Sequence, residues 1–338
     1  MMKSMAGRIE MVRIGIVGFG GMGQVHFMNY KKIKDCQVVA TVNNSEPGKH
    51  KAEEFGLAYY EDIKKMVENE DIDVIDICTP TFLHKQHVME SLNFGKHVIV
   101  EKPIALHKED AIEMYALARE KNCLLFVAYV LQFTKEIEIL HDAVKSGKYG
   151  KPLDGFFERI SGRPGWSQNG WLFDKEKSGL IPFDLHIHDL DIIVSLFGEP
   201  EGYEYTSSGG KERDFKEQYR LTYKFKDLYV VAEAAWYNAD FPFTARWRIY
   251  FENGLLVNDG KNVILYQKDK EPYVYDTKEE VLVSTGINLP PTGMFYNELS
   301  HFISCIEKGN SSEKVSKQQV LTGIGILEEI TFGAGLKS

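Results

Sequence analysis

The fold of the first part of this chain is decided by the segment Arg13-Ile14-Gly15-Ile16-Val17-Gly18-Phe19-Gly20-Gly21-Met22-Gly23-Gln24-Val25-His26. Glycines follow the apolar run 14–17 in the spacing G-x-G-x-x-G, and a segment with helical character comes next. In a strand–turn–helix unit the first glycine makes the tight turn, the second admits a pyrophosphate and the third lets the helix pack on the strand. The helix N-terminus attracts the phosphates. The segment therefore predicts a dinucleotide site, but no particular reaction, at Gly18, Phe19, Gly20, Gly21, Met22 and Gly23.

Length and composition limit the classes of protein that fit. A chain of 338 residues suggests two domains, and 43% hydrophobic with 26% charged residues is ordinary for a globular protein. The net charge of −9, without a basic run, argues against nucleic acid as the main partner. No apolar stretch approaches the roughly 20 residues of a membrane helix. Four cysteines without a C-x-x-C pair fit a reducing compartment, so we expect a cytoplasmic protein.

Strand-like and helical runs alternate through the first 130 residues. The expected strands are 13–17, 37–42, 73–78, 97–100 and 124–128, and the expected helices are 22–33, 47–55, 61–68, 84–94 and 108–121. This alternation predicts an α/β domain with a doubly wound parallel (Rossmann) sheet, which we place at residues 1–131.

After about residue 150 the apolar residues alternate with a period of two, as in strands that bury one face. The expected strands are 217–236, 244–251, 255–258 and 263–267, with a hairpin turn at Asn253-Gly254. In the second of these strands one face carries Ala245, Trp247, Ile249 and Phe251, and the other carries Thr244, Arg246, Arg248 and Tyr250. Helical patterns return at 293–308 and 316–334. We therefore expect an α+β domain at 132–338 with a mainly antiparallel sheet, of which one face is buried and the other could meet another subunit.

Ligands of doubly wound sheets collect where the parallel strands end. The second strand ends at Asn43, where an acid is expected to hold a ribose 2′-hydroxyl. Asn43 does not repel a 2′-phosphate, and Ser45, Lys49 and His50 lie near enough to meet one. The sequence therefore does not decide whether the cofactor is NAD or NADP. The third strand ends at Thr79-Pro80-Thr81.

The fourth strand ends at Glu101-Lys102-Pro103. A lysine on a protein surface is usually a solvated charge, but a lysine at the tip of a buried strand on the cofactor side favours a functional role. Lys102 is therefore a candidate catalytic residue. Glu101 could pair with Lys102 or contact the nicotinamide ribose.

A second group of polar residues lies in the segment 182–191, Pro-Phe-Asp-Leu-His-Ile-His-Asp-Leu-Asp, which begins a predicted helix that ends before Gly198. At about 100° per residue, Asp184, His188 and Asp191 fall on one stripe. A carboxylate one turn before a histidine stabilises the charged ring and makes a competent general base. The alternatives are that Asp184 satisfies a buried histidine or faces the helix dipole.

The acids and histidines of this segment are also residue types that bind metal ions. On a regular helix, however, His186 lies about 200° from Asp184, so the set cannot converge on one ion. We expect no metal.

These segments together resemble the glucose–fructose oxidoreductase / inositol dehydrogenase (Gfo/Idh/MocA) family. The resemblance rests on Gly18-Phe19-Gly20-Gly21-Met22-Gly23, Thr79-Pro80-Thr81-Phe82-Leu83-His84, Glu101-Lys102-Pro103, the D-x-x-x-H-x-x-D pattern from Asp184 to Asp191, and Phe295, Glu298 and Phe302. It runs from about residue 12 to residue 335.

The resemblance implies an NAD(P)-dependent oxidoreductase of sugars and cyclitols. It also implies that the second domain has a large, mainly antiparallel open sheet and serves substrate binding and oligomerisation, as a homodimer or homotetramer. It places Lys102, Asp184 and His188 on the family's catalytic positions. In hydride transfer, His188 would take the hydroxyl proton, Asp184 would hold its ring, and Lys102 would stabilise the developing alkoxide. The implied cofactor contacts are the glycine segment with Asn43, Thr79, Pro80, His84, Glu101 and Lys102.

Three positions depart from the family pattern, and they leave the substrate undetermined. His186 stands where glycine is common, Gln132 where arginine is common, and Asn43 where many members carry an acid. The loop 162–171 is polar and aromatic, as a polyol pocket would be, although its tryptophans could equally fill the seam between the domains. The expected substrate contacts are Tyr129, Gln132, Asn169, Trp171, Asp184 and His188.

Two other functions stay open. One is a non-catalytic sensor that uses the same fold to bind a dinucleotide or a sugar. The other is a redox-assisted, NAD-dependent glycoside hydrolase.

Overall fold

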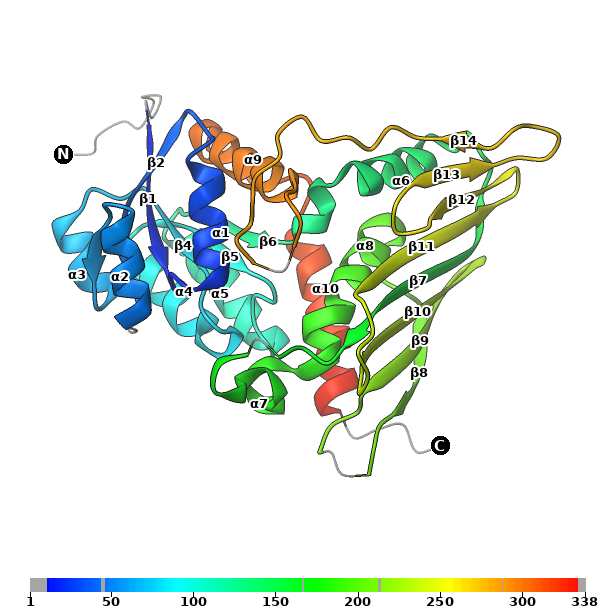
Figure 1. Cartoon of the computed structure of the whole chain (residues 1–338), viewed down its shortest axis with the longest axis horizontal. Coiled ribbons are helices and arrows are strands. Elements are labelled where there is room, and N and C mark those ends of the chain that lie inside the picture. The colour runs from blue at the N-terminus through cyan, green and yellow to red at the C-terminus, as the bar shows by residue number, and fades with distance from the viewer. Residues whose placement is uncertain (1–10, 44–45, 166, 212–213, 288, 334–338) are drawn as a thin grey trace. The chain divides into compact units, whose positions relative to one another are not determined.

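The computed structural model describes residues 11–43, 46–165, 167–211, 214–287 and 289–333, which form two compact units (Figure 1). The first unit takes its residues from Met1–Ala105, Glu109–Phe133 and Glu279–Ser316. The second takes them from Leu106–Lys108, Thr134–Lys278 and Lys317–Ser338. No helix in the described part of the chain is long and apolar enough to cross a membrane.

The first unit contains a six-stranded parallel sheet with the strand order β3-β2-β1-β4-β5-β6. Its strands are β1 (Val12–Val17), β2 (Cys36–Val42), β3 (Ala58–Tyr60), β4 (Val74–Ile77), β5 (His97–Glu101) and β6 (Leu125–Ala128). Its helices are α1 (Gly21–Tyr30), α2 (Glu46–Glu54), α3 (Ile63–Asn69), α4 (His84–Asn93), α5 (Lys108–Glu120) and α9 (Met294–Lys308), with short turns η1 (Thr81–Leu83) and η2 (Val130–Phe133). The predicted Rossmann sheet is confirmed. The strand order reverses between β1 and β4, which places the ligand-binding crevice at their carboxyl ends.

The second unit contains an eight-stranded sheet with the order β14-β13-β12-β11-β7-β10-β9-β8. Its strands are β7 (Pro152–Gly162), β8 (Gly202–Ser208), β9 (Gln218–Phe225), β10 (Leu228–Tyr237), β11 (Thr244–Phe251), β12 (Gly254–Asn258), β13 (Val263–Tyr266) and β14 (Tyr273–Val274). Its helices are α6 (Lys135–Ser146), α7 (Lys175–Ser178), α8 (Ile187–Phe197) and α10 (Lys317–Phe332), with turns η3 (Gln168–Phe173) and η4 (Pro182–His186). The β7–β10 pair is parallel and the other pairs are antiparallel, so the prediction of a mainly antiparallel sheet is confirmed.

Strand β11 shows the predicted alternation. Trp247, Ile249 and Phe251 are buried, whereas Arg246, Arg248 and Tyr250 are exposed. The hairpin after it is shifted by one residue from the prediction. Phe251 pairs with Gly254, so the two-residue loop is 252–253 and the glycine begins β12. A side chain on Gly254 would stand 3.2 Å from the carbonyl oxygen of Tyr266 on β13, which explains the glycine inside the strand.

The segment 279–316 packs in the first unit, although it follows the second sheet in the sequence and was predicted to belong with it. Its helix α9 buries Phe295, Leu299 and Phe302, and it packs against α1, β1 and η2. The ring of Phe302 stacks on Phe126 of β6 with their centres 4.9 Å apart. An amphipathic helix encodes its buried face but not which sheet it covers, so the sequence alone does not assign this segment.

Candidate functional site

The three motif glycines of the first unit occupy different surroundings. Gly18 has φ = +92°, a backbone conformation that favours glycine. A Cβ on Gly23 would lie 2.1 Å from the carbonyl oxygen of Gly18, so a side chain there would push α1 away from β1. A Cβ on Gly20, in contrast, would meet no atom of the described residues within 4 Å, and no described side chain caps the helix that follows. This open backbone at a helix N-terminus fits a pyrophosphate.

The end of β2 is closed by a contact with β3. The Tyr59 hydroxyl donates a hydrogen bond to the backbone carbonyl oxygen of the half-buried Asn43. The ammonium group of Lys49 lies 5.9 Å from the centre of the Tyr59 ring, so one predicted cation is near this strand end. Ser45 lies outside the described residues.

His84 connects the segments that follow β4 and β5. Its Nδ1 lies 2.7 Å from the carbonyl oxygen of Pro103, and its Nε2 lies 2.8 Å from that of Thr79. Burial lowers the pKa of this ring. Both ring nitrogens therefore face the protein's own backbone, and His84 supports the two loops. Pro80, which follows Thr79, is the residue just before η1.

Glu101 and Lys102 stand at the carboxyl end of β5. One carboxylate oxygen of the buried Glu101 accepts the backbone N–H of Lys102 at 3.0 Å, and the other lies 3.0 Å from Nε2 of His26. Burial raises the pKa of Glu101, but the hydrogen bond from His26 and the charges of His26 and Lys102 outweigh it, so the pKa is lowered. The carboxylate is thus ionised and held on both oxygens.

The predicted helix around Asp184 is not regular. Residues Pro182–His186 form a π-helical turn, in which the N–H of Ile187 donates to the carbonyl oxygen of Pro182. The count of 100° per residue fails there because a π turn holds more residues than an α turn. Asp184 and His188 are half-buried, while the residues between them are buried. These two side chains therefore face partly outward from a helix that is otherwise part of the core.

The other polar residues of this helix serve the packing of the second unit. Asp189 forms a buried bidentate pair with Arg159 of β7, at 2.9 and 3.2 Å. Asp191 is buried and accepts a 2.6 Å hydrogen bond from Gln319 of α10.

His186 is also a packing residue. Its Nε2 lies 2.5 Å from the Tyr223 hydroxyl, and the two rings are nearly parallel. Burial and the charge of Arg159 lower its pKa to about 3, so the ring is neutral. This explains a histidine where the family commonly has glycine: it fills the space between the helix and β9.

The predicted substrate contacts are divided between the units. Tyr129 and Gln132 are buried in the first unit, close to β6 and in η2. In the second unit, Asn169 is exposed with φ = +54° and Trp171 is half-buried. Trp166 and the side chain of Gln168 lie outside the described residues.

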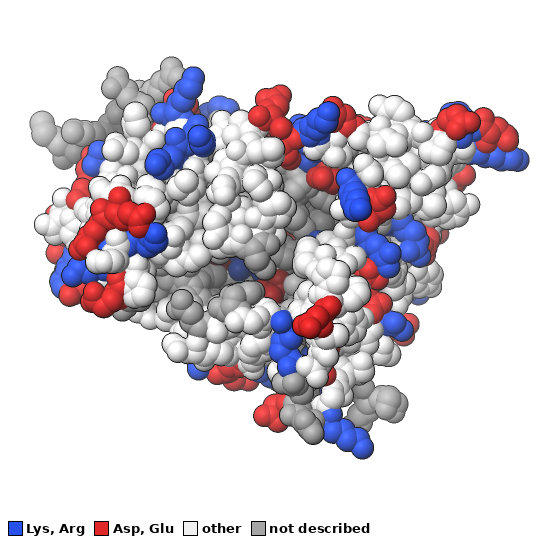
Figure 2. Space-filling view, in the orientation of Figure 1, with Lys and Arg blue, Asp and Glu red and all other residues white. Residues whose placement is uncertain are grey.

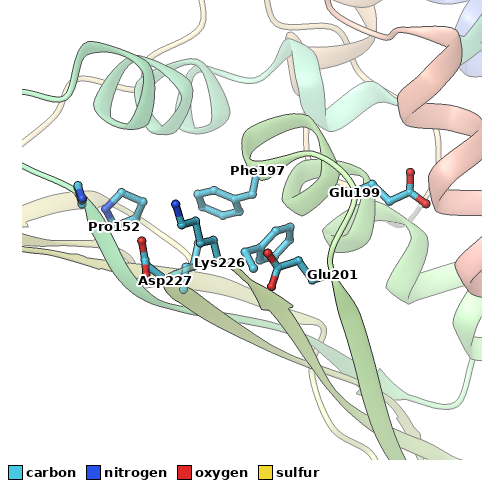
Figure 3. A pocket seen from close by; sticks show the side chains of 9 residues that line it. Pro152, Phe197, Glu199, Glu201, Lys226 and Asp227 are labelled. Carbon is cyan, nitrogen blue, oxygen red and sulfur yellow. The ribbon is translucent and has the colours of Figure 1, made fainter.

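A separate cavity of about 390 Å³ lies in the second unit, beside the end of α8 and the β9–β10 turn (Figure 3). Phe197, Phe225 and Pro152 supply its apolar lining, and Lys226 and Asp227 supply charge. Among the described residues that line it there is none of the predicted site residues, so we do not assign the chemistry to it.

Charged side chains do not gather into a basic surface in the view of Figure 2. On this face the described lysines and arginines are intermingled with aspartates and glutamates. The mixture of both signs on this face agrees with a chain whose net charge is −9.

The strand order and the glycine turn define the class of protein: its first unit is a dinucleotide-binding Rossmann domain. Two family models match the chain. One, described as oxidoreductase family, NAD-binding Rossmann fold, matches residues 12–129, and the other, described as GFO/IDH/MocA C-terminal domain, matches residues 137–257. The chain belongs to the Gfo/Idh/MocA oxidoreductase family.

Among similar proteins, 2,7-anhydro-N-acetylneuraminate hydratase of Escherichia coli (strain K12) is 29% identical over 56% of this chain and 50% of its own length. Myo-inositol 2-dehydrogenase of Thermotoga maritima is 29% identical over 56% of this chain and 55% of its own. The chain thus spans about half the length of these curated relatives. A structure of levoglucosan dehydrogenase in complex with NADH and levoglucosan shares the fold, with a TM-score of 0.82 at 21% identity over 96% of this chain and 97% of that chain.

Alanine substitutions should separate the roles of two motif glycines. The open backbone at Gly20 and the N-terminus of α1 is called the phosphate cradle below. Gly20→Ala should weaken NAD binding at least about tenfold because the methyl group enters this cradle, with little change in stability. Gly23→Ala should instead lower the free energy of unfolding by about 1–3 kcal/mol, since α1 must move from β1. Urea unfolding and calorimetric titration with NAD measure both effects. Wild-type NAD affinity in folded Gly20→Ala would contradict the assignment of the cradle.

Proposed function

We propose that this protein is an NAD(P)-dependent oxidoreductase that transfers hydride between the cofactor and a secondary alcohol or ketone of a sugar, cyclitol or related polyol. The observation that carries the proposal is the position of Lys102, at the carboxyl end of β5, on the same sheet edge as the glycine turn after β1. Family membership and the name of the Thermotoga relative support this substrate class. The presence of both Lys102 and His188 favours an enzyme over a sensor.

Each proposed catalytic residue has one task. His188 takes the proton from the substrate hydroxyl, and Asp184, four residues earlier, orients the ring and stabilises its charged form. Lys102 donates a hydrogen bond to the substrate oxygen as negative charge develops. Proton transfer and charge stabilisation of this kind are each worth about 2–4 kcal/mol. When bound, the nicotinamide supplies the hydride acceptor. Tyr129, Gln132, Asn169 and Trp171 are proposed to hold the remaining hydroxyl groups.

Removing either proposed catalytic residue should slow turnover strongly while the cofactor still binds. Lys102→Met and His188→Ala should each lower kcat at least about a hundredfold. Lys96→Met, which changes the lysine before the amino end of β5, is the matched control and should retain activity. The assay follows the absorbance of the reduced cofactor with sugars and cyclitols, in the presence of NAD or NADP. Wild-type rates in either catalytic variant would refute the mechanism.

We propose that Asn43 lets the site accept NADP as well as NAD. Asn43→Asp should raise the preference for NAD over NADP at least about tenfold, because a carboxylate binds the ribose 2′-hydroxyl and repels a 2′-phosphate. Asn69→Asp, at an exposed position at the end of α3, makes the same change away from the predicted cofactor contacts and controls for added charge. The ratio of kcat/KM for the two cofactors measures the preference. An unchanged ratio would show that Asn43 does not face the ribose.

The open face of the eight-stranded sheet is the proposed surface for a homodimer or homotetramer. Tyr229 and Tyr250 flank Asp154 across three neighbouring strands and are 53% and 48% exposed. Beside them Arg248 stands 4.4 Å from the ring centre of Phe156, and Arg246 pairs with Glu158 at 2.7 Å. Exposed aromatic groups with arginine are typical of the centre of a protein interface.

A charge in the middle of this face should separate the subunits. Tyr250→Glu should convert a sedimenting dimer or tetramer to a monomer, because self-association would bury the carboxylates. Phe94→Glu, at an exposed position after α4 in the first unit, should leave the assembly intact. A wild-type protein that sediments as a monomer would refute the proposed interface.

We also propose that the protein works in the cytoplasm. Its four cysteines are unbridged thiols, as a reducing compartment maintains them. Recovery of the native protein in an extracellular or periplasmic fraction would contradict this location.

A further inference from the structure

A buried cluster of charged groups lies beside the cofactor strands of the first unit. His26 of α1 is fully buried. Its Nδ1 is 2.7 Å from Oδ2 of Asp76 on β4, and its Nε2 is 3.0 Å from Oε1 of Glu101 on β5. One imidazole ring thus connects a helix with carboxylates from two neighbouring strands.

The geometry, together with the charges of the carboxylates, favours a doubly protonated ring. A neutral imidazole has one N–H, whereas both nitrogens of His26 face carboxylate oxygens. Asp76 is itself an acceptor, because the Tyr30 hydroxyl donates to its Oδ2 at 2.8 Å. Burial by itself lowers the pKa of His26. The negative charge of Asp76, its hydrogen bond to the ring and the neighbouring Cys78 together raise the pKa by more, so that it ends above its ordinary value. The ring therefore supplies one charged hydrogen bond to each carboxylate.

Glu101 connects His26 with Lys102 through its two carboxylate oxygens. Its second oxygen, Oε2, accepts the backbone N–H of Lys102 at 3.0 Å. The carboxylate is fixed at one end by the ring and at the other by the residue that bears the candidate catalytic ammonium. Without the ring, the Glu101 side chain loses the partner that sets its torsion angles, and the backbone at Lys102 loses an oriented acceptor.

We propose that His26 is a positioning residue, whose charged ring ties α1 to Glu101 and thereby sets the place of Lys102 for hydride transfer. This inference rests on the proposed function of Lys102. In this proposal helix α1 acts at two places. Its N-terminus binds the phosphates, and His26 in its second turn holds the end of β5.

The first test is kinetic. His26→Gln leaves a side chain that cannot donate to both carboxylates, and kcat should fall about 10- to 100-fold, as misplacement of a catalytic group by a fraction of an ångström to an ångström does. KM for NAD and for substrate should stay within about threefold, because the cradle is intact.

Two variants of α1 serve as controls. Tyr30→Phe removes the donor on the far side of Asp76, and Asn29→Ala changes another fully buried polar residue of α1, whose side chain donates to the Val25 carbonyl oxygen. Both controls should keep kcat within about twofold.

A second variant distinguishes a loss of positioning from a loss of the fold. Removal of the imidazolium alone leaves two buried carboxylates close together, which is destabilising. His26→Gln/Asp76→Asn removes opposite charges together and should fold, as circular dichroism and NAD binding would verify. It should show the same loss of kcat.

A readout without turnover separates this inference from the proposed function. Lysines are dimethylated with ¹³C-formaldehyde, and Lys102→Arg assigns the Lys102 methyl signal in NMR spectra. His26→Gln, or the double variant, should shift or broaden that signal, while Tyr30→Phe leaves it in place. An unchanged signal and unchanged kcat in a folded variant would overturn the role of His26. If the wild-type protein transfers no hydride, the proposed function fails, and the NMR signal alone decides for or against His26.

Discussion

The close approach of helix α1 to strand β1 is the constraint on which the first unit depends. The space between Gly23 and the carbonyl oxygen of Gly18 is too small for any side chain. Because the helix packs this closely, its N-terminus opens at the end of β1, where a phosphate group can reach backbone N–H groups. The same packing brings His26 within hydrogen-bond distance of Asp76 and Glu101. The proposed phosphate site and the proposed support of Lys102 therefore share one origin.

In the second unit, one helical segment carries both packing residues and the proposed catalytic residues Asp184 and His188. His186, Asp189 and Asp191 are buried and bonded to β9, β7 and α10. A buried ion pair such as Arg159–Asp189 is tolerable because both partners are aligned and hydrogen-bonded. Asp184 and His188 are half-buried on the same segment. The π turn at Pro182–His186 changes the direction of the side chains just before His188, and π turns are frequent at functional sites.

Much of the fold follows from local patterns. The five strands and five helices expected in the first 130 residues all form. The strands are short apolar runs, and the longer segments between them form the helices. Strand β3 was missed because three residues are too few to show a period. Strand β7 was missed for another reason. It buries Glu158 and Arg159, whose partners Arg246 and Asp189 lie far away in the sequence, so its polar residues resemble those of a loop.

By itself, the sequence determined the glycine turn, the parallel sheet around it and the family, because these depend on neighbouring residues whose backbone needs are visible in their order. It also placed Lys102 at a strand end and predicted that Asp184 orients His188. Only the tertiary structure decided that α9 joins the first unit, that the helix before His188 contains a π turn, and that His186 and Asp191 serve packing. It alone connected His26 with Asp76 and Glu101, 50 and 75 residues further along the chain. The reason is physical: backbone conformation is a local property, whereas the partner of a buried charge is chosen by whichever distant group the packed fold brings within hydrogen-bond distance.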